Sequence, residues 1–375
     1  MKNILLHTPE GVRDIYGNEL TGKEHIEQVI GEKLSSFGYE SIETPTFEFF
    51  DVFSREIGTI PSRELYKFID KEGNTLVLRP DFTPSIARCA AKYYMDETQP
   101  IRFCYKGNTF INTGSLQGKL KEITQMGAEL MNDDSVEADA EMIALVVESL
   151  LQTGLREFQV SIGEVEYFKG LCEEAGLSLE TAEDLRELIS GKNLFGAEEL
   201  LKERNVCTEE RERLLKISDF FGAVEILNEA EIQVHNKTSQ KAVSHLKKLY
   251  EVLKAYGVEK YVSFDLGMLS KYHYYTGVIF KAFSYGVGDA IVKGGRYDKL
   301  LGYFGKSAPA IGFAIVIDDL LLSLEHQNGT YQEKPAVQKI TYTESNFTEK
   351  LKMAQTLRSE GGRIALIPET ERIEV

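Results

Sequence analysis

Two polar side chains on one expected strand have the spacing of a ligand site. Gln125 and Glu129 are four residues apart in a stretch that is otherwise apolar or small, and such residues of a strand project from one face. Gly127 stands between them and is expected to leave room for a ligand. A carboxylate on a strand that is covered on both faces must be paired or bound. The alternative interpretation is a solvated strand face.

A second candidate group lies where a strand is expected to end and a helix to begin. Within the segment RPDFTP, Asp81 and Thr83 offer a carboxylate and a hydroxyl that can both face a ligand ammonium. An Asp in this place also caps a helix without any ligand. Tyr275 and Tyr297 come from the later segments HYYTG and GGRYD, where the structural alternatives are sheet packing for the tyrosines and a tight turn for the glycine pair.

The elements that must position these residues fall into three stretches. Residues 1–166 and 256–328 predict one core of strands and amphipathic helices, ending in a helix from about 313 to 325. Residues 167–255 have helical periodicity and predict a helical insertion, and residues 335–375 predict a short C-terminal α/β segment. Because strands and helices do not alternate along the chain, the sequence predicts an α+β fold with a mixed, mainly antiparallel sheet flanked by helices.

The composition narrows the classes of function. A net charge of −16 disfavours tRNA or DNA as a partner, because nucleic-acid affinity rests on Lys and Arg displacing counterions. No apolar run reaches the roughly 18 residues of a membrane helix. The scattered cysteines and histidines indicate reduced thiols, a cytoplasmic location and no metal site. The glycine clusters lack the spacing of a nucleotide-binding loop, so no cofactor is expected.

The order of these segments resembles the class II aminoacyl-tRNA synthetases, and within them the histidyl branch. The match covers about 8–166 and 261–324, and it is carried by TPEGVRDI, LVLRPDFTPSIAR, QMGAE, YYTG, GGRYDKLLGYFG and PAIGFAI. The resemblance implies a class II synthetase-like core with a pocket for free histidine. Its ligand-binding positions in this chain would be Asp81 (Glu in the synthetases), Thr83, Gln125, Glu129, Tyr275 and Tyr297. The first three would lie near the ammonium group and the last three around the imidazole.

The sequence departs from the synthetases where ATP is bound. Ile111 and Thr113 replace the arginine and glutamate of motif 2, Ser270 replaces the histidyl-specific catalytic arginine, and Asp319 replaces the arginine of motif 3. Adenylate formation needs cations near the transferring phosphoryl group, and losing one such donor costs around a hundredfold in rate. The resemblance therefore implies no synthetase activity, and the short C-terminal segment implies no full anticodon-binding domain.

A histidine pocket without ATP or tRNA functions resembles the regulatory subunits of ATP phosphoribosyltransferase. That resemblance implies a non-catalytic protein that the short-form catalytic subunit requires for the first step of L-histidine biosynthesis, and that contributes to feedback inhibition by L-histidine. It also implies a homodimer within a hetero-oligomer, built on the motif 1 helix and strand at about 19–47. Two alternatives stay open: a histidine-binding sensor for another partner, and a divergent amino-acid-activating enzyme.

Overall fold

A computed structural model describes residues 6–54, 60–114, 120–269, 274–327 and 336–369. The chain divides into two compact units. The first comprises Met1–Ile15 and Lys23–Thr330, and the second comprises Tyr16–Gly22 and Tyr331–Val375. Among the described residues, no helix is both long enough and apolar enough to cross a membrane.

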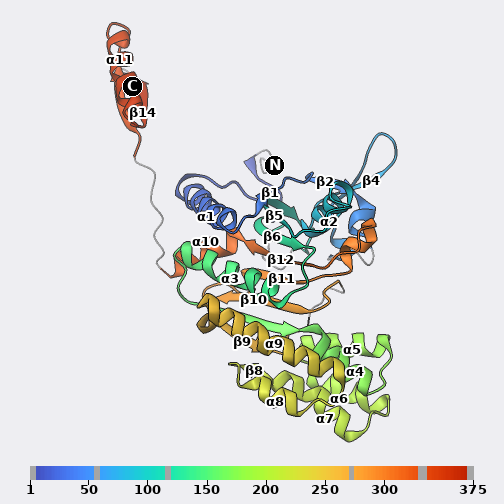
Figure 1. Ribbon diagram of the computed structural model, residues 1–375. Coiled ribbons are helices and arrows are strands. Elements are labelled where there is room, and N and C mark those ends of the chain that lie inside the picture. Colours follow the sequence, from blue (N-terminus) through green and yellow to red (C-terminus); the bar gives the residue numbers. More distant parts are fainter. Residues whose placement is uncertain (1–5, 55–59, 115–119, 270–273, 328–335, 370–375) are drawn as a thin grey trace. The chain divides into compact units, whose positions relative to one another are not determined.

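The first unit is built on a large sheet. In the described part of the chain nine strands join in the order β1-β5-β6-β12-β11-β10-β7-β9-β8 (Figure 1). The β1–β5 and β7–β9 pairs are parallel and the others antiparallel. The mixed, mainly antiparallel sheet that the sequence predicts is thus confirmed. The strands are β1 Glu40–Ser41, β5 Ile101–Phe110, β6 Glu122–Met131, β7 Phe158–Glu164, β8 Phe221–Gly222, β9 Val262–Asp265, β10 Val278–Ser284, β11 Val292–Arg296 and β12 Ala310–Val316.

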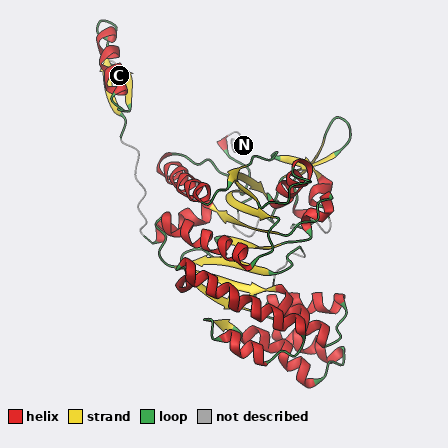
Figure 2. Cartoon of the chain, viewed as in Figure 1, coloured by secondary structure: helices red, strands yellow, loops and turns green. Residues whose placement is uncertain are grey.

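Helices flank this sheet (Figure 2). Three strands that lie between β1 and β5 in the chain form a second, smaller sheet. The small antiparallel sheet has the order β2-β4-β3, with β2 Phe47–Phe49, β3 Lys67–Ile69 and β4 Thr75–Leu78. The helices are α1 Gly17–Ser36, α2 Thr83–Tyr93, α3 Val136–Gln152, α4 Val165–Glu174, α5 Leu179–Ser190, α6 Leu194–Glu203, α7 Thr208–Lys216, α8 Ile226–Ile232, α9 Lys237–Tyr256 and α10 Ile317–His326. Helices α4 to α9 follow one another with only the short β8 between them, and α9 packs on both α3 and α4.

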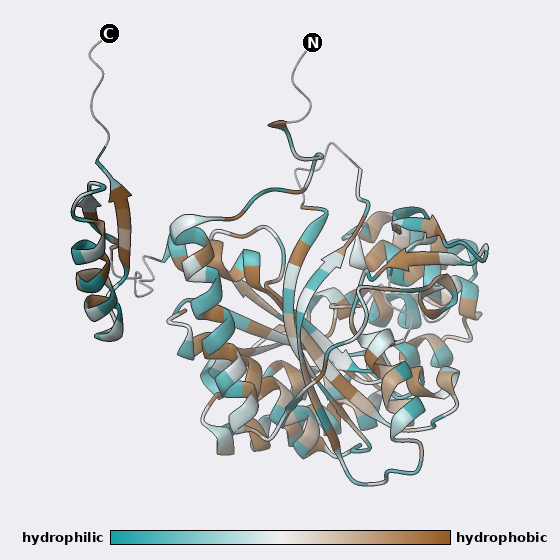
Figure 3. Cartoon of the chain, turned by 90° about the horizontal axis from the view of Figure 1, so that it is seen from above, coloured by the Kyte–Doolittle hydropathy of each residue, from teal (hydrophilic) through white to brown (hydrophobic). Residues whose placement is uncertain are grey.

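The two faces of the large sheet differ in what covers them. On one face the apolar residues of β6, namely Met126, Ala128 and Leu130, are buried where α3 and α10 contact β6 and β12. On the other face the Phe82 ring, just before α2, stacks on Tyr105 with ring centroids 4.4 Å apart. The hydropathy colours of Figure 3 show apolar stretches along the central strands and mixed polar and apolar surfaces on the helices. The hydrophobic core therefore lies against both faces, and Glu129 is on the Tyr105 face.

One expected helix is placed wrongly by the sequence. The helix expected from about 313 begins only at Ile317, because the preceding residues form β12, which pairs with β6 and β11. A short apolar run is compatible with either a buried strand or a helix, so its periodicity does not decide. Gly294 and Gly295 pair within β11, so the tight turn that was the structural alternative for them is not formed. The rings of Phe280 and Tyr275 occupy the space where their side chains would be.

The second unit contains a two-stranded parallel sheet and one helix. These elements are β13 Gln338–Tyr342, α11 Phe347–Ser359 and β14 Ile364–Pro368, and α11 contacts both strands. The segment thus contains two strands with one helix between them in the chain.

Candidate functional site

The centre of the candidate site is the carboxylate of Glu129 on β6. Its side chain is only 1% exposed. The hydroxyl of Thr83, at the start of α2, donates a hydrogen bond to Oε1 at 2.8 Å. The hydroxyl of Tyr297, which follows β11, donates a short hydrogen bond to Oε2. Three segments far apart in sequence thus converge on one carboxylate.

A glycine on the neighbouring strand makes room for this carboxylate. Gly312 of β12 is the register partner of Glu129, and a Cβ atom added there would overlap Glu129 Oε2. A strand glycine commonly marks a close approach of this kind. The Glu129 carboxylate therefore occupies the space that a side chain at Gly312, in the segment PAIGFAI, would need.

Burial gives Glu129 an unusual proton affinity. Desolvation raises the pKa of Glu129 to about 8, although the hydrogen bonds from Tyr297 and Thr83 act to lower it, and Asp81 adds a further increase. Both hydrogen-bond partners are neutral hydroxyls. A cationic or N–H-bearing ligand would supply the compensation that a buried carboxylate needs.

Asp81 and Gln125, two further predicted ligand-binding residues, differ in their hydrogen bonding. Asp81 Oδ1 accepts hydrogen bonds from the backbone N–H of Phe82, the N-cap residue of α2, at 2.6 Å and of Thr83 at 3.3 Å. Gln125 also lies on β6, and its buried Oε1 has no hydrogen-bond partner among the described residues. An acceptor left in this way is suited to an N–H donor from a ligand.

The expectation that Gly127 leaves room for a ligand is wrong. A Cβ atom at Gly127 would overlap the Tyr105 hydroxyl and the backbone oxygen of Phe313. Tyr105 is the register partner of Gly127 on β5, and its hydroxyl donates a hydrogen bond to that same oxygen at 3.3 Å. The glycine thus accommodates an aromatic side chain of the protein itself.

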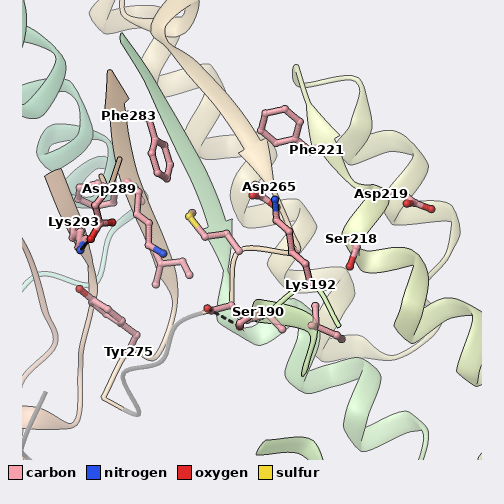
Figure 4. A pocket seen from close by; sticks show the side chains of 18 of the residues that line it. Ser190, Lys192, Ser218, Asp219, Phe221, Asp265, Tyr275, Phe283, Asp289 and Lys293 are labelled. Carbon is pink, nitrogen blue, oxygen red and sulfur yellow. Dashed lines mark hydrogen bonds and ion pairs between the residues drawn. The ribbon is translucent and has the colours of Figure 1, made fainter. Parts of the chain in front are cut away.

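Tyr275 lines an open cleft. A Cβ atom at Gly295 would come within 2.8 Å of the Tyr275 ring, so this ring lies over β11. The cleft has a volume of 850 Å³, and Figure 4 shows Tyr275 at one side of it, with Lys192, Asp265 and Lys293 among the charged side chains that line it. Register pairs link Glu129 to Gly312, Gly312 to Gly295 and Gly295 to Ile279, and Ile279 lines the cleft. The candidate site and the cleft therefore share one face of the sheet.

Comparisons with known proteins agree on the family. The family model described as histidyl-tRNA synthetase matches residues 11–320. A protein from Acetivibrio thermocellus named ATP phosphoribosyltransferase regulatory subunit is 43% identical over 95% of this chain and 85% of its own length. The chain belongs to the ATP phosphoribosyltransferase regulatory subunits.

Solved structures place this family on a class II synthetase fold. A crystal structure from Bacillus halodurans, described as an ATP phosphoribosyltransferase regulatory subunit/histidyl-tRNA synthetase, has a TM-score of 0.88 and 33% identity over 100% of this chain and 96% of that one. A histidyl-tRNA synthetase from Nostoc sp. shares the fold, with a TM-score of 0.81 over 98% of this chain and 87% of that one at 20% identity. The predicted class II synthetase-like core is confirmed.

This regulatory-subunit chain presents no arginine at the described positions where the synthetase pattern requires one. Ile111 and Thr113 follow β5, and the buried Thr113 hydroxyl lacks a hydrogen-bond partner within the described structure. Asp319 lies in the first turn of α10, beside Asp318, whose carboxylate pairs with Lys23 at 3.1 Å. Ser270 lies outside the described residues. The described part of the chain also contains no group of His, Cys, Asp and Glu side chains suited to a metal ion.

Sequence reasoning missed a buried ionic cluster on the opposite face of the sheet. Asp139 of α3 is fully buried and pairs with Arg296 and with His245 of α9, while His245 also contacts Glu164. One signal was available in this family member: Asp139 stands between two alanines in the apolar stripe of an amphipathic helix. A charge in such a place requires a partner.

Proposed function

We propose that this chain is the non-catalytic regulatory subunit that a short-form ATP phosphoribosyltransferase catalytic subunit requires, and that it binds L-histidine for feedback regulation. Family membership supports the regulatory role. The single observation that carries the histidine assignment is the buried Glu129 carboxylate, which accepts hydrogen bonds from the Thr83 and Tyr297 hydroxyls. The interactions described for Glu129 include no cationic partner.

The donor set suits histidine better than an aliphatic amino acid. An imidazole has two ring nitrogens that need separate partners, and a carboxylate beside a phenol supplies an acceptor and a donor or acceptor. Asp81, Thr83 and Gln125 would receive the ammonium group, which donates three hydrogen bonds. A buried site of this kind rejects ligands that lack a matching group, because its own polar atoms would then stay unpaired.

The proposal of a non-catalytic role rests on the nucleotide positions. An Ile, a Thr and an Asp at positions 111, 113 and 319 offer no positive charge to an α-phosphate or an adenine. Electrostatic stabilisation of the phosphoryl group supplies most of the catalysis in such reactions. ATP–pyrophosphate exchange in the presence of histidine is expected to stay at background, and robust exchange would show that the chain is an amino-acid-activating enzyme.

Calorimetry with L-histidine tests the site. Wild type is expected to bind, and Glu129→Ala is expected to lose binding because the imidazole loses its acceptor. Glu251→Ala on the exposed surface of α9 serves as the matched control and should bind like wild type. Unchanged affinity in Glu129→Ala would move the site elsewhere, and no binding by wild type, alone or with its catalytic partner, would remove histidine as the ligand.

Reconstitution tests the partner. A short-form catalytic subunit from the same cell is expected to co-purify with this chain, and its phosphoribosyltransferase activity is expected to depend on it. We also propose a homodimer within that complex, formed through the helix and strand at about 19–47. Histidine binding without any effect on the catalytic subunit would favour a sensor that serves another partner.

A further inference from the structure

The helical insertion is tied to the core through His245. This side chain projects from α9, and its Nε2 lies 3.0 Å from Asp139 Oδ2 on α3. Its Nδ1 lies 3.1 Å from Glu164 Oε2 at the end of β7. Both carboxylates are almost completely buried, with exposed side-chain fractions of 1% and 3%. One imidazole of the insertion therefore bridges two buried acids of the core.

The same Asp139 carboxylate holds Arg296 at the end of β11. Arg296 Nε and Nη2 donate to Asp139 Oδ1 at 2.9 and 2.6 Å. Its Nη1 donates to Asp298 Oδ1 at 3.2 Å, and the other oxygen of Asp298 accepts a hydrogen bond from the Thr276 hydroxyl at 3.0 Å. The cluster thus continues from α9 to the backbone that flanks Tyr275 and Tyr297.

Strand geometry transmits this contact through the sheet. Successive side chains of a strand point to opposite faces. Arg296 points to the α3 side, where it meets Asp139, and Tyr297 points to the other side, where it donates to Glu129. The backbone N–H of Tyr297 bonds to Ala310 at 2.7 Å, so the alternation continues past the end of β11. The position of the Arg296 side chain and that of the Tyr297 hydroxyl are fixed by one short piece of backbone.

We infer that His245 is a positioning residue through which the helical insertion holds Asp139, Arg296 and hence the Tyr297 hydroxyl in place for ligand binding at Glu129. The inference rests on the proposed histidine site for its ligand. It assigns the insertion a role in that site: any movement of α9 that withdraws His245 leaves Asp139 less well paired and loosens the backbone before Tyr297.

The protonation state of His245 makes the link measurable. Burial lowers the pKa of His245, but the contacts with Asp139 and Glu164 outweigh that effect and raise it to about 9. The charged groups that act on it are Asp139 from α3 and Glu164 from β7, with Arg296 on the far side of Asp139. A cationic His245 is therefore the state present at neutral pH, and loss of its charge above pH 9 should leave the Asp139 carboxylate, and with it Arg296, less firmly positioned.

Histidine calorimetry on three α9 variants tests the inference. At pH 7.5, His245→Gln is expected to weaken binding roughly tenfold, in the lower part of the range for coupling between sites. His245→Lys keeps a positive charge and should recover most of the affinity. Lys247→Gln breaks only the exposed pair with Glu231 on the same helix and should match wild type. Equal affinity in wild type and a folded His245→Gln would overturn the inference.

A pH series and hydrogen exchange separate this inference from the identity of the ligand. In wild type the affinity should decrease above about pH 9, where His245 loses its charge. This decrease should be absent in His245→Gln, whereas titration of the ligand itself affects both proteins equally. Without ligand, amide exchange of 292–298 should be faster in His245→Gln than in Lys247→Gln. If wild type binds no histidine but this exchange still differs, the proposed ligand is wrong and the positioning role stands. Identical exchange would remove the positioning role whatever the ligand.

Discussion

Two buried carboxylates lie on opposite faces of the same sheet, and they are satisfied in opposite ways. Asp139 is surrounded by cationic groups: Arg296 donates two hydrogen bonds to it and His245 contacts its other oxygen. Glu129 is surrounded by hydroxyls, and desolvation raises its pKa to about 8. Asp139 is thus paired within the fold, whereas Glu129 retains a capacity for an external cation or N–H donor.

The comparison explains why one region is structural and the other a candidate site. A buried acid with charged partners contributes order, and removing a partner leaves an uncompensated charge. A buried acid that is held only by neutral donors keeps an elevated proton affinity, which marks functional sites more often than structural ones. The two regions meet in the backbone between Arg296 and Tyr297, so a substitution in one region should alter the side-chain positions in the other.

The largest expected effect comes from breaking the paired acid. Arg296→Met keeps the apolar stem of the side chain but leaves Asp139 Oδ1 without its two hydrogen bonds from Arg296, which is expected to lower the free energy of unfolding by ~3–5 kcal/mol. Denaturant unfolding at pH 7 measures it. Lys254→Met, which removes an exposed pair with Glu251, is the control and should change stability by less than about 1 kcal/mol. A similar small change for both variants would mean that the Asp139 cluster adds nothing to the fold.

A smaller loss of stability is expected when an added side chain crowds the Glu129 carboxylate. Gly312→Ala places a methyl group where Glu129 Oε2 lies, so the carboxylate or β12 must move, at a cost of ~1–3 kcal/mol. Histidine binding should weaken in the same variant. Gly302→Ala is a matched control, because a Cβ atom added there has open space around it. Normal stability and binding in Gly312→Ala would show that the close approach is not required.

Much of the sheet could be predicted from sequence because its signals are local. Among the described residues, all strands of the large sheet except the two-residue β8 lie within 1–166 and 256–328, the stretches in which the sequence predicts a core of strands and helices. The convergence of Thr83, Glu129 and Tyr297 was accessible only because their segments follow a known family order. Periodicity alone gives no distance between residues that are 168 positions apart.

The unexpected roles of the glycines have one physical cause, which is that side chains from other strands fill the space beside them. Gly127 accommodates Tyr105 and Gly294 accommodates Phe280, and neither contact is visible before strands are paired. The ionic cluster was missed for the same reason. Asp139, His245 and Arg296 come from three distant segments, so each looks ordinary in its own stretch of sequence.

The Glu129 acid should also give stability a pH dependence. Its folded pKa of about 8 is above the value near 4.5 of an exposed Glu, so its contribution is fully present below pH 4.5 and is lost as the pH rises through 8. Glu129→Gln cannot ionise, so its loss of stability between pH 5 and 8.5 should be smaller than that of wild type. Denaturant unfolding across that range measures it, and parallel curves for the two proteins would contradict the raised pKa.

The smallest effect should come from the imidazole of the Asp139 cluster, and it has the same sign but a different pH window. His245 has a folded pKa of about 9 against 6.5 when exposed, so its stabilising charge is fully present below pH 6.5 and is lost as the pH rises through 9. Because its side chain is 30% exposed, solvent screens the pairs and the loss should be roughly 0.5–1 kcal/mol. Unfolding curves of wild type and His245→Gln should therefore converge between pH 6.5 and 9.5. Convergence below pH 6.5 would instead assign the titration to Glu164, whose pKa is also raised by burial.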